Sequence, residues 1–366
     1  MIVLSRPYPN ISALLFNKAS LNLFDLEFYP LGRCALLSGL IKMGVKKGDT
    51  IIIPAYICYS TIQPLERYGY KIKYIDIGRD LYFSIDDIKK AASQSKVKAI
   101  LMVHYFGFTQ KLDSIVNECH KLGIKVVEDA SHSFLSQLSL DRLDIKGDLE
   151  IFSMRKNFPV KDGGALRLNC IGTSPNIQKC SSLTGDLKYL LIRYVEKVFV
   201  VLGINIYNIS ITRLKNNVRN KQNKIKYDAY CGVCQPSFQL GRYLNNKQYL
   251  EKTKTCIIAN FNQLSKEIDA LGFKLFVKSV DHDAPQAIVI YDKTYGLVDY
   301  LRSNGVGAWH WPNKEMPKVI FEHIDQYPNS IHFNKSLVAL PVHQSVEKKH
   351  IDYMVRVLKK YISNND

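Results

Sequence analysis

This chain of 366 residues has few acidic residues in comparison with its basic residues. There are 33 Asp and Glu against 50 Lys and Arg, so the formal net charge is 50 − 33 = +17. An excess of this size favours anionic partners such as phosphates, nucleotides, acidic membranes or nucleic acid, but it does not choose among them. The 46% content of hydrophobic residues excludes a disordered or fibrous chain and fits a soluble globular protein.

Long apolar runs are also missing. The longest apolar segment, residues 189–206, is interrupted by Arg193, Glu196 and Lys197, so no spanning helix is expected. Residues 1–10 lack the apolar core of a signal peptide, which predicts a cytoplasmic protein. Eight cysteines without a signal peptide indicate reduced thiols. Cys231 and Cys234 form a single C-x-x-C, and no second pair completes a zinc site.

Residues 31 to about 130 alternate between strand-like and helix-like patterns. The expected strands are 50–54, 70–77, 97–103 and 124–127, and the expected helices are 60–68, 85–93 and 111–122. Short links between them predict an α/β domain with a mostly parallel sheet flanked by helices. In such sheets ligands bind beyond the carboxyl ends of the strands, which here are 54–59, 104–107 and 128–132.

The second half of the chain has a different character. An apolar segment at 187–209 is followed by 211–227, which carries six basic residues and no acidic one. Helical patterns at 248–271, 299–303 and 348–362, with strand candidates at 273–277 and 287–291, predict a smaller α/β domain. We therefore expect a large domain of residues 1–240 and a small C-terminal domain of residues 241–366.

Three segments carry residues suited to one site. Gly32-Arg33-Cys34 opens a helix, whose free N–H groups can bind a phosphate. An apolar strand ends in Glu128-Asp129, which places a carboxylate at the ligand edge. Lys156 follows a short strand and precedes the turn Asp162-Gly163-Gly164, and a desolvated lysine in such a place can form a Schiff base. Each segment alone also fits a surface turn, a helix cap or an exposed lysine.

Together these segments resemble the fold type I pyridoxal-phosphate enzymes, and more narrowly the nucleotide-sugar aminotransferases of the DegT/DnrJ/EryC1/StrS family. The similar motifs are G-D-x-I-I-I-P-A-Y at 48–56, the V-H-x-F-G-like stretch at 103–107, G-I-K-V-V-E-D-A at 123–130 and D-G-G-A-L at 162–166. The similarity covers residues 31 to 168, weakens after 170 and returns faintly at 340–344. It implies a large domain that binds pyridoxal 5'-phosphate and a smaller C-terminal domain.

The resemblance also implies roles for individual residues. Lys156 matches the lysine that holds the cofactor covalently, and Asp129 matches the carboxylate that faces its pyridine nitrogen. The remaining cofactor-binding positions are Gly32, Arg33 and Cys34 at the phosphate turn, Ser153 beside them, His132 near the phenolic oxygen, and Cys58 where the family often has an aromatic residue. Tyr56 or Tyr59 are alternatives for that stacking role.

Some positions depart from the family pattern. Ser153 and Lys156 are three residues apart where the family commonly has five. The segment that reaches the neighbouring subunit's cofactor has no convincing match, and Asn217-Val218-Arg219 is the nearest string. Three histidines are further candidates: His104 for a cofactor or substrate contact, His310 for the substrate pocket and His343 for a role left open. For the Trp309–Trp311 cluster around His310, packing is the preferred interpretation.

The function implied is an aminotransferase that moves an amino group from glutamate to a nucleotide-linked keto sugar, for surface polysaccharide or secondary-metabolite biosynthesis, in a homodimer. Two alternatives remain. The first is a pyridoxal-phosphate enzyme of other chemistry or substrate, although dehydratases resembling this family carry His in place of the lysine. The second is a basic protein that binds membrane surfaces through 187–227, for which a core or interface helix followed by a solvated loop is the preferred interpretation. Nucleic-acid binding is not expected, because no recognition motif appears.

Overall fold

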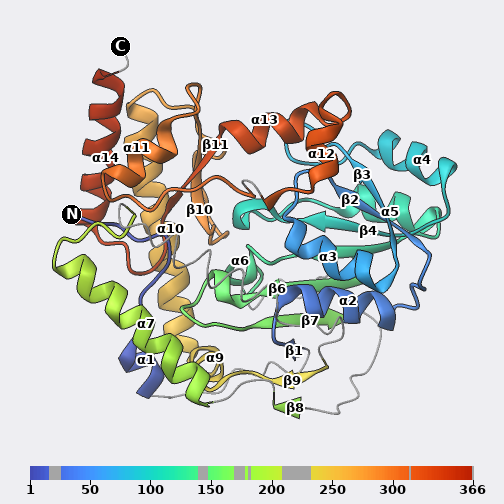
Figure 1. Ribbon diagram of the computed structural model, residues 1–366, viewed down its shortest axis with the longest axis horizontal. Helices are drawn as coiled ribbons and strands as arrows, with labels where there is room; N and C mark the ends of the chain where they lie inside the picture. The colour runs from blue at the N-terminus through green and yellow to red at the C-terminus, as the bar shows by residue number, and fades with distance from the viewer. Residues whose placement is uncertain are drawn as a thin grey trace.

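A computed structural model describes residues 1–15, 26–138, 147–168, 178–179, 183–207, 232–312 and 315–364 (Figure 1). Its centre is a seven-stranded sheet in the order β1-β7-β6-β5-β4-β2-β3. The strands are β1 (Glu27–Tyr29), β2 (Thr50–Pro54), β3 (Lys71–Ile75), β4 (Val97–Val103), β5 (Lys125–Asp129), β6 (Leu149–Ser153) and β7 (Gly164–Leu168). The five strands from β6 to β3 run parallel, and β7 is antiparallel to both of its neighbours. The predicted mostly parallel sheet is confirmed.

The central strands are buried on both faces. β2, β4, β5 and β6 have nearly continuous buried residues, such as Ile51, Ile52 and Ile53 in β2. A strand whose side chains are buried on alternate sides must be covered from both sides, which is why these strands read as unbroken apolar runs. The covering helices of this part include α2 (Gly32–Lys42), α3 (Tyr59–Tyr68), α4 (Ile85–Gln94) and α5 (Asp113–Lys121).

The C-terminal part packs around a two-stranded antiparallel sheet of β10 (Ala287–Tyr291) and β11 (Leu337–Pro341). Its main helices are α10 (Lys247–Ala270), α11 (Leu297–Ser303), α12 (Lys318–Glu322), α13 (Pro328–Ser336) and α14 (Lys348–Ser363). The strand predicted at 273–277 does not form. Leu275 makes one bridge to Ile290, and Phe276 N–H donates to the Val289 carbonyl, so this stretch follows β10 without becoming a ladder.

The remaining elements join the two parts. They include α1 (Ile11–Leu15), α6 (Phe134–Gln137), the short pair β8 (Gln178–Lys179) and β9 (Cys234–Gln235), α7 (Leu183–Val201) and α9 (Phe238–Leu244). The domain division at residue 240 remains a prediction, and α9 spans that position. The basic segment 211–227 and the string 217–219 lie outside the described residues. Within the described ranges, no helix is both long enough and apolar enough to cross a bilayer.

Candidate functional site

The carboxyl ends of the parallel strands open onto a cavity of about 950 Å³. Its lining comes from both parts of the chain and includes seven of the eight predicted cofactor-binding residues: Gly32, Arg33, Cys58, Asp129, His132, Ser153 and Lys156. Parallel strands end at the same edge of a sheet, and this brings residues more than a hundred positions apart in the sequence onto one wall. Two of the three predicted strand ends, 54–59 and 128–132, line the cavity, whereas no residue of 104–107 does.

The amino end of α2 forms one side of the cavity. The amides of Cys34 and Ala35 both donate to the Leu31 carbonyl, and Gly32 and Arg33 occupy the first two positions of the helix, whose amino end attracts anions. A Cβ on Gly32 would lie 3.0 Å from the Phe152 carbonyl oxygen and 3.5 Å from Ser131 Oγ. The missing side chain thus leaves a concave cradle between backbone amides and a serine hydroxyl, which suits a phosphate.

The Gly163-Gly164 turn braces that cradle from behind. Gly163 has φ +115°, which favours glycine, and its amide donates to the Pro30 carbonyl at 3.1 Å. A Cβ on Gly164 would overlap the carbonyl group of Leu31, so the two backbones touch. The sequence motif therefore fixes the entry to α2, although neither glycine lines the cavity itself.

Asp129 is the last residue of β5 and is only 6% exposed. Its Oδ1 accepts a hydrogen bond from the Ser131 amide at 2.9 Å, which directs the carboxylate along the start of the following turn. Ser131 itself lines the cavity. It lies inside the predicted motif but was not singled out, because a serine beside two acids looks like a simple turn residue.

Lys156 lies at the end of a 3₁₀ turn, Met154–Lys156, that continues from β6. Burial of the ammonium lowers the pKa of Lys156 from 10.5 to about 8, and the negative charge of Asp129 partly opposes that shift. The positive charges of Arg155 and Arg6 lower it further. A substantial fraction of this amine is consequently uncharged near neutrality, as a nucleophile or proton acceptor requires.

His132 is buried against Trp311, with ring centroids 5.0 Å apart in a T-shaped contact. The Phe106 amide donates to His132 Nδ1 at 3.1 Å, so the ring hydrogen is on Nε2. Burial, followed by the charge of Lys156, holds the pKa of His132 well below its usual range. The ring is therefore neutral and can offer Nε2–H to an oxygen in the cavity.

Two predicted positions have different surroundings. Cys34 is buried on α2 and does not line the cavity, because the helix turns its side chain into the core. Cys58 lines the cavity and contacts Ser60 Oγ at 3.1 Å and Glu315 Oε2 at 3.2 Å. Neither Tyr56 nor Tyr59 is among the lining residues, so neither supplies the stacking ring.

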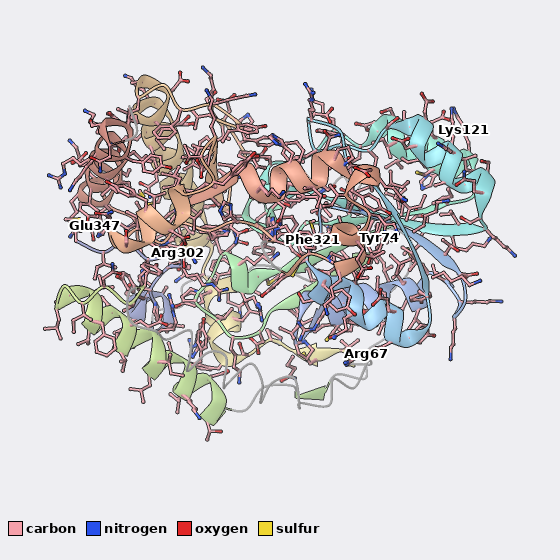
Figure 2. All side chains as sticks on the ribbon, turned by 45° about the horizontal axis from the view of Figure 1, so that its top comes forward. Arg67, Tyr74, Lys121, Arg302, Phe321 and Glu347 are labelled. Atoms are coloured by element: carbon pink, nitrogen blue, oxygen red, sulfur yellow. The ribbon has the colours of Figure 1, made fainter. Side chains whose placement is uncertain are left out.

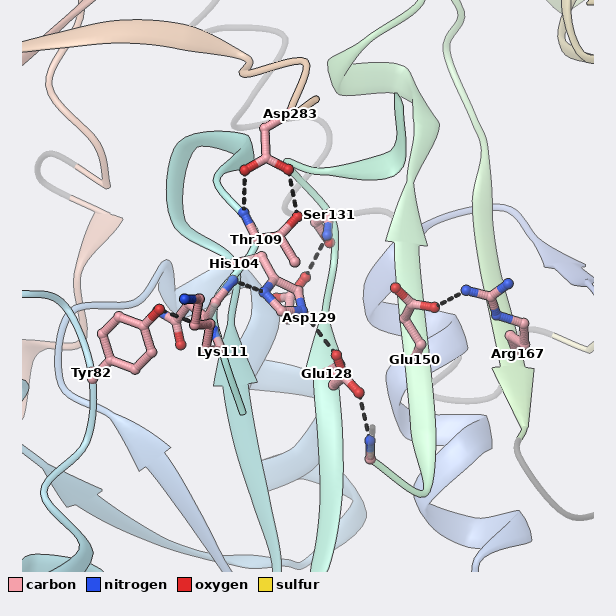
Figure 3. A network of polar contacts seen from close by, with 12 residues as sticks. Tyr82, His104, Thr109, Lys111, Glu128, Asp129, Ser131, Glu150, Arg167 and Asp283 are labelled. Atoms are coloured by element: carbon pink, nitrogen blue, oxygen red, sulfur yellow. Dashed lines mark hydrogen bonds and ion pairs between the residues drawn. The ribbon is translucent and has the colours of Figure 1, made fainter. Parts of the chain in front are cut away.

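His104 is also turned away from the cavity. Its Nδ1 accepts from the Gln110 amide at 3.0 Å, so Nε2–H donates to Glu128 Oε2, also at 3.0 Å (Figure 3). The sequence places His104 correctly at the end of a strand but cannot give its rotamer. The buried Glu128 binds the His104 ring on the side away from the cavity. His343 is likewise a structural residue, with its Nε2 bonded to the Leu4 carbonyl at 2.9 Å.

Several lining residues were not predicted. Arg6, Arg155 and Arg302 come from the N-terminal segment, the 3₁₀ turn and α11, and they add positive charge to the cavity. Burial, with the charges of Arg6 and Arg33, lowers the pKa of Arg155. Trp309, His310 and Trp311 all line the cavity, so this cluster does more than pack. The sequence carries no signal for Arg6 or Arg302, because their positions depend on how distant segments fold together.

These residues fit pyridoxal phosphate. The cofactor needs an anion cradle, a carboxylate for its ring nitrogen and a lysine of lowered pKa within one cavity. The α2 amino end, Asp129 and Lys156 meet those three requirements.

Comparison with known proteins also finds similarity to aminotransferases. Residues 32–179 match the model of the DegT/DnrJ/EryC1/StrS aminotransferase family. Over 135 residues the chain is 29% identical to protein MosB of Rhizobium meliloti, and over 133 residues it is 24% identical to the GDP-perosamine synthase of Vibrio cholerae. Each match spans 36% of this chain, and covers 27% of MosB and 36% of the synthase.

The similarity in fold extends further than the similarity in sequence. The structure of NtdA from Bacillus subtilis with bound cofactor PMP superposes with a TM-score of 0.67 at 16% identity, over 99% of this chain and 86% of NtdA. This likeness confirms the predicted fold type I architecture along the chain. The match to the family model is shorter and holds only part of the cavity lining, because Arg6, Arg302 and Trp311 lie outside it. The similarity to the DegT/DnrJ/EryC1/StrS aminotransferase family lies in residues 32–179, which are less than half of the chain.

Proposed function

We propose that the chain is a pyridoxal-phosphate-dependent aminotransferase that transfers an amino group from glutamate to a nucleotide-linked keto sugar. The observation that carries this proposal is the meeting of Lys156 and Asp129 on one cavity, with the pKa of Lys156 lowered to about 8. A surface lysine and an unrelated carboxylate at a strand end would not be expected to line the same cavity.

Each residue then has a defined task. Pyridoxal phosphate, when bound, supplies an electron sink for a carbanion at the substrate carbon. The amides of Gly32 and Arg33, with Ser131 and Ser153, hold the phosphate. Asp129 keeps a positive charge on the ring nitrogen. His132 donates Nε2–H to an oxygen without bringing a charge of its own.

Lys156 carries the proton. Its uncharged Nζ would accept a proton from the substrate carbon and donate it to a neighbouring carbon atom, which is general acid–base catalysis. A pKa of about 8 lets the same amine accept and release protons near neutral pH. Lys156 would also be the residue that holds pyridoxal phosphate when it is bound.

The substrate class follows from the charge and size of the cavity. About 950 Å³ lies near the upper end of the ~300–1,000 Å³ typical of small-molecule sites, so room remains beyond a cofactor. Arg6, Arg155 and Arg302 line the cavity, and guanidinium groups bind phosphates in a bidentate way. GDP-perosamine synthase and MosB are relatives by sequence, and the former's name records a nucleotide sugar.

A second candidate keeps the cofactor and performs dehydration. Lys156 argues against it, because some sugar dehydratases resembling this family carry His at that position. Homodimerisation and a place in surface polysaccharide or secondary-metabolite biosynthesis remain part of the proposal.

The test begins with the spectrum of the purified chain. With added pyridoxal phosphate we expect a visible-range absorbance band that borohydride fixes on the peptide containing Lys156. Glutamate should then release 2-oxoglutarate in a half-reaction, and a panel of nucleotide keto sugars should identify the acceptor. A chain that stays colourless would refute the proposal. A coloured chain that releases no 2-oxoglutarate but dehydrates a sugar would favour the second candidate.

A further inference from the structure

Helix α7 and the turn after it expose a set of large apolar side chains. Leu191 is 64% exposed, Leu202 66% and Val201 77%. The full set is Leu187, Leu191, Ile192, Val195, Val198, Val201, Leu202 and Ile204. Single exposed apolar residues are common on protein surfaces, but eight within eighteen positions form a patch of the kind that marks an interaction site.

Most of these residues lie on one side of the helix. Positions 187, 191, 195, 198 and 202 are separated by four, four, three and four residues, the spacing that aligns side chains along a helix. We call these five residues the α7 apolar face. Figures 1 and 2 both show α7 along the outer edge of the molecule, and Figure 2 shows side chains projecting from it.

The opposite side of α7 is firmly attached. Arg193 is buried, and its Nη2 donates to the Pro7 carbonyl at 2.9 Å and to the Arg6 carbonyl at 3.3 Å. Gln239 on α9 donates to the Asp186 carbonyl at 2.7 Å. These buried polar contacts fix the rotation of the helix, so its apolar face points outward because the inner face is anchored. Of the two preferred interpretations of this segment, a core helix would have the opposite arrangement, whereas an interface helix would not.

The charges around the face are positive. Lys188 and Lys197 are exposed beside it, whereas Asp186 is buried and Glu196 pairs with Arg193. From residue 183 to 227 the sequence has nine basic and two acidic residues, so its net charge is 9 − 2 = +7. Six of those basic residues, at 211–227, lie outside the described residues and contribute here only through their charge.

We propose that the α7 apolar face docks on an anionic lipid bilayer, with α7 lying in the interface. A helix with an apolar face between lysines binds such a surface by burying that face among the headgroups while the cations meet anionic lipids. A second copy of the chain fits less well, because two chains that each carry a net charge of +17 repel one another. The inference is independent of the chemistry proposed for the cavity.

The test is co-sedimentation of the full chain with phosphatidylcholine vesicles, with and without phosphatidylglycerol. We expect binding that requires phosphatidylglycerol and weakens as salt rises. The double variant Leu191→Glu/Val198→Glu should bind at least about tenfold more weakly, because two charges would enter the apolar boundary. Circular dichroism checks that the variant remains folded.

The matched control is Phe321→Glu/Ile324→Glu, which alters two exposed apolar residues on and beside α12, far from α7 (Figure 2). This control should bind vesicles as the unaltered chain does. Failure of the unaltered chain to bind phosphatidylglycerol vesicles would overturn the proposal, as would equal losses in both double variants. Conversion of a dimer to a monomer by the α7 variant, without vesicle binding, would show that a second copy covers the face.

Discussion

Individual side chains in the cavity owe their chemistry to their surroundings. Lys156 is one of 50 basic residues, and it differs from the rest through burial and the neighbouring charges of Arg155 and Arg6. His132 is neutral for the same physical reason, since burial disfavours a charged ring. A lysine and a histidine of ordinary sequence context thereby become groups suited to proton transfer and hydrogen-bond donation.

The lowered pKa of Lys156 predicts its reactivity in the cofactor-free chain. Only the uncharged amine reacts with formaldehyde, so reductive methylation of Lys156 should rise with pH through a midpoint near 8 instead of 10.5. Mass spectrometry of the digest measures this, with the exposed Lys90 as an internal reference. Between pH 8 and 10.5 the unfolded chain binds more protons at this lysine, so its contribution to stability should increase with pH. A midpoint near 10.5 would show that the amine is not desolvated.

Asp129→Asn is expected to keep the fold and lose most of the reaction. The amide preserves the acceptor for the Ser131 amide but removes the negative charge. We expect the amino-transfer rate to fall by at least ~100-fold, within the range seen when a group that controls proton transfer is lost. Stopped-flow absorbance with glutamate measures this. Asp325→Asn, an exposed change, should leave the rate unaltered, and an unaffected Asp129→Asn would remove this carboxylate from the mechanism.

At the level of the elements, the site depends on how the Gly163-Gly164 turn packs against the amino end of α2. The amino end of α2 is held in place because the Gly163-Gly164 turn packs directly on Pro30 and Leu31. α2 itself is buried along most of its length, and a Cβ on Gly39 would collide with Leu149 of β6. The phosphate cradle is therefore set by close backbone packing that only glycine permits.

Gly164→Ala should disturb the cradle. The added methyl would overlap the Leu31 carbonyl, so we expect a loss of about 1–3 kcal/mol in the free energy of unfolding and weaker binding of pyridoxal phosphate. Urea denaturation and absorbance titration measure the two effects. Gly241→Ala on α9 is the matched control, because open space surrounds that position and alanine favours a helix. Equal behaviour of the two variants would contradict the packing argument.

Over the whole molecule, the cavity exists because the C-terminal part is held against the sheet. Asp283 accepts hydrogen bonds from the Thr109 amide at 3.1 Å and from Thr109 Oγ1 at 2.7 Å (Figure 3). Nearby, the Gln286 amide donates to the Phe106 carbonyl at 2.8 Å, and Gln286 lines the cavity. This junction sets the distance between the wall that carries Asp129 and the wall that carries Arg302.

Asp283→Ala tests that junction. It leaves two donors of Thr109 without their partner, so we expect the free energy of unfolding to fall by about 1–3 kcal/mol. Urea denaturation measures the change, and Asp281→Ala, an exposed neighbour, should have almost no effect. If the junction positions the cavity wall, the affinity for the proposed nucleotide-sugar substrate should drop more than that for pyridoxal phosphate. A variant as stable as the Asp281 control would show that the junction lies elsewhere.

The sequence alone predicted the parallel part of the large sheet and seven of the residues that line the cavity at its edge. Apolar runs such as 50–54 and 97–103 are unmistakable because strands buried on both faces tolerate few polar residues. Asp129, Lys156 and the glycine turn are short-range signals tied to strand ends, so their shared location follows from the topology. The strand predicted at 273–277 was wrong, because pairing depends on a partner that local pattern cannot supply.

Other features of the cavity and of the surface depend on tertiary contacts that the sequence pattern does not reveal. The direction of the His104 ring, the burial of Cys34 and the entry of Arg6 and Arg302 into the cavity depend on contacts between segments distant in the chain. The same holds for α7, whose apolar pattern fits either a core helix or an interface helix. The anchoring of Arg193 turns its apolar face outward. The sequence pattern shows which residues are apolar, but the packing of the elements determines which of them are buried inside the protein.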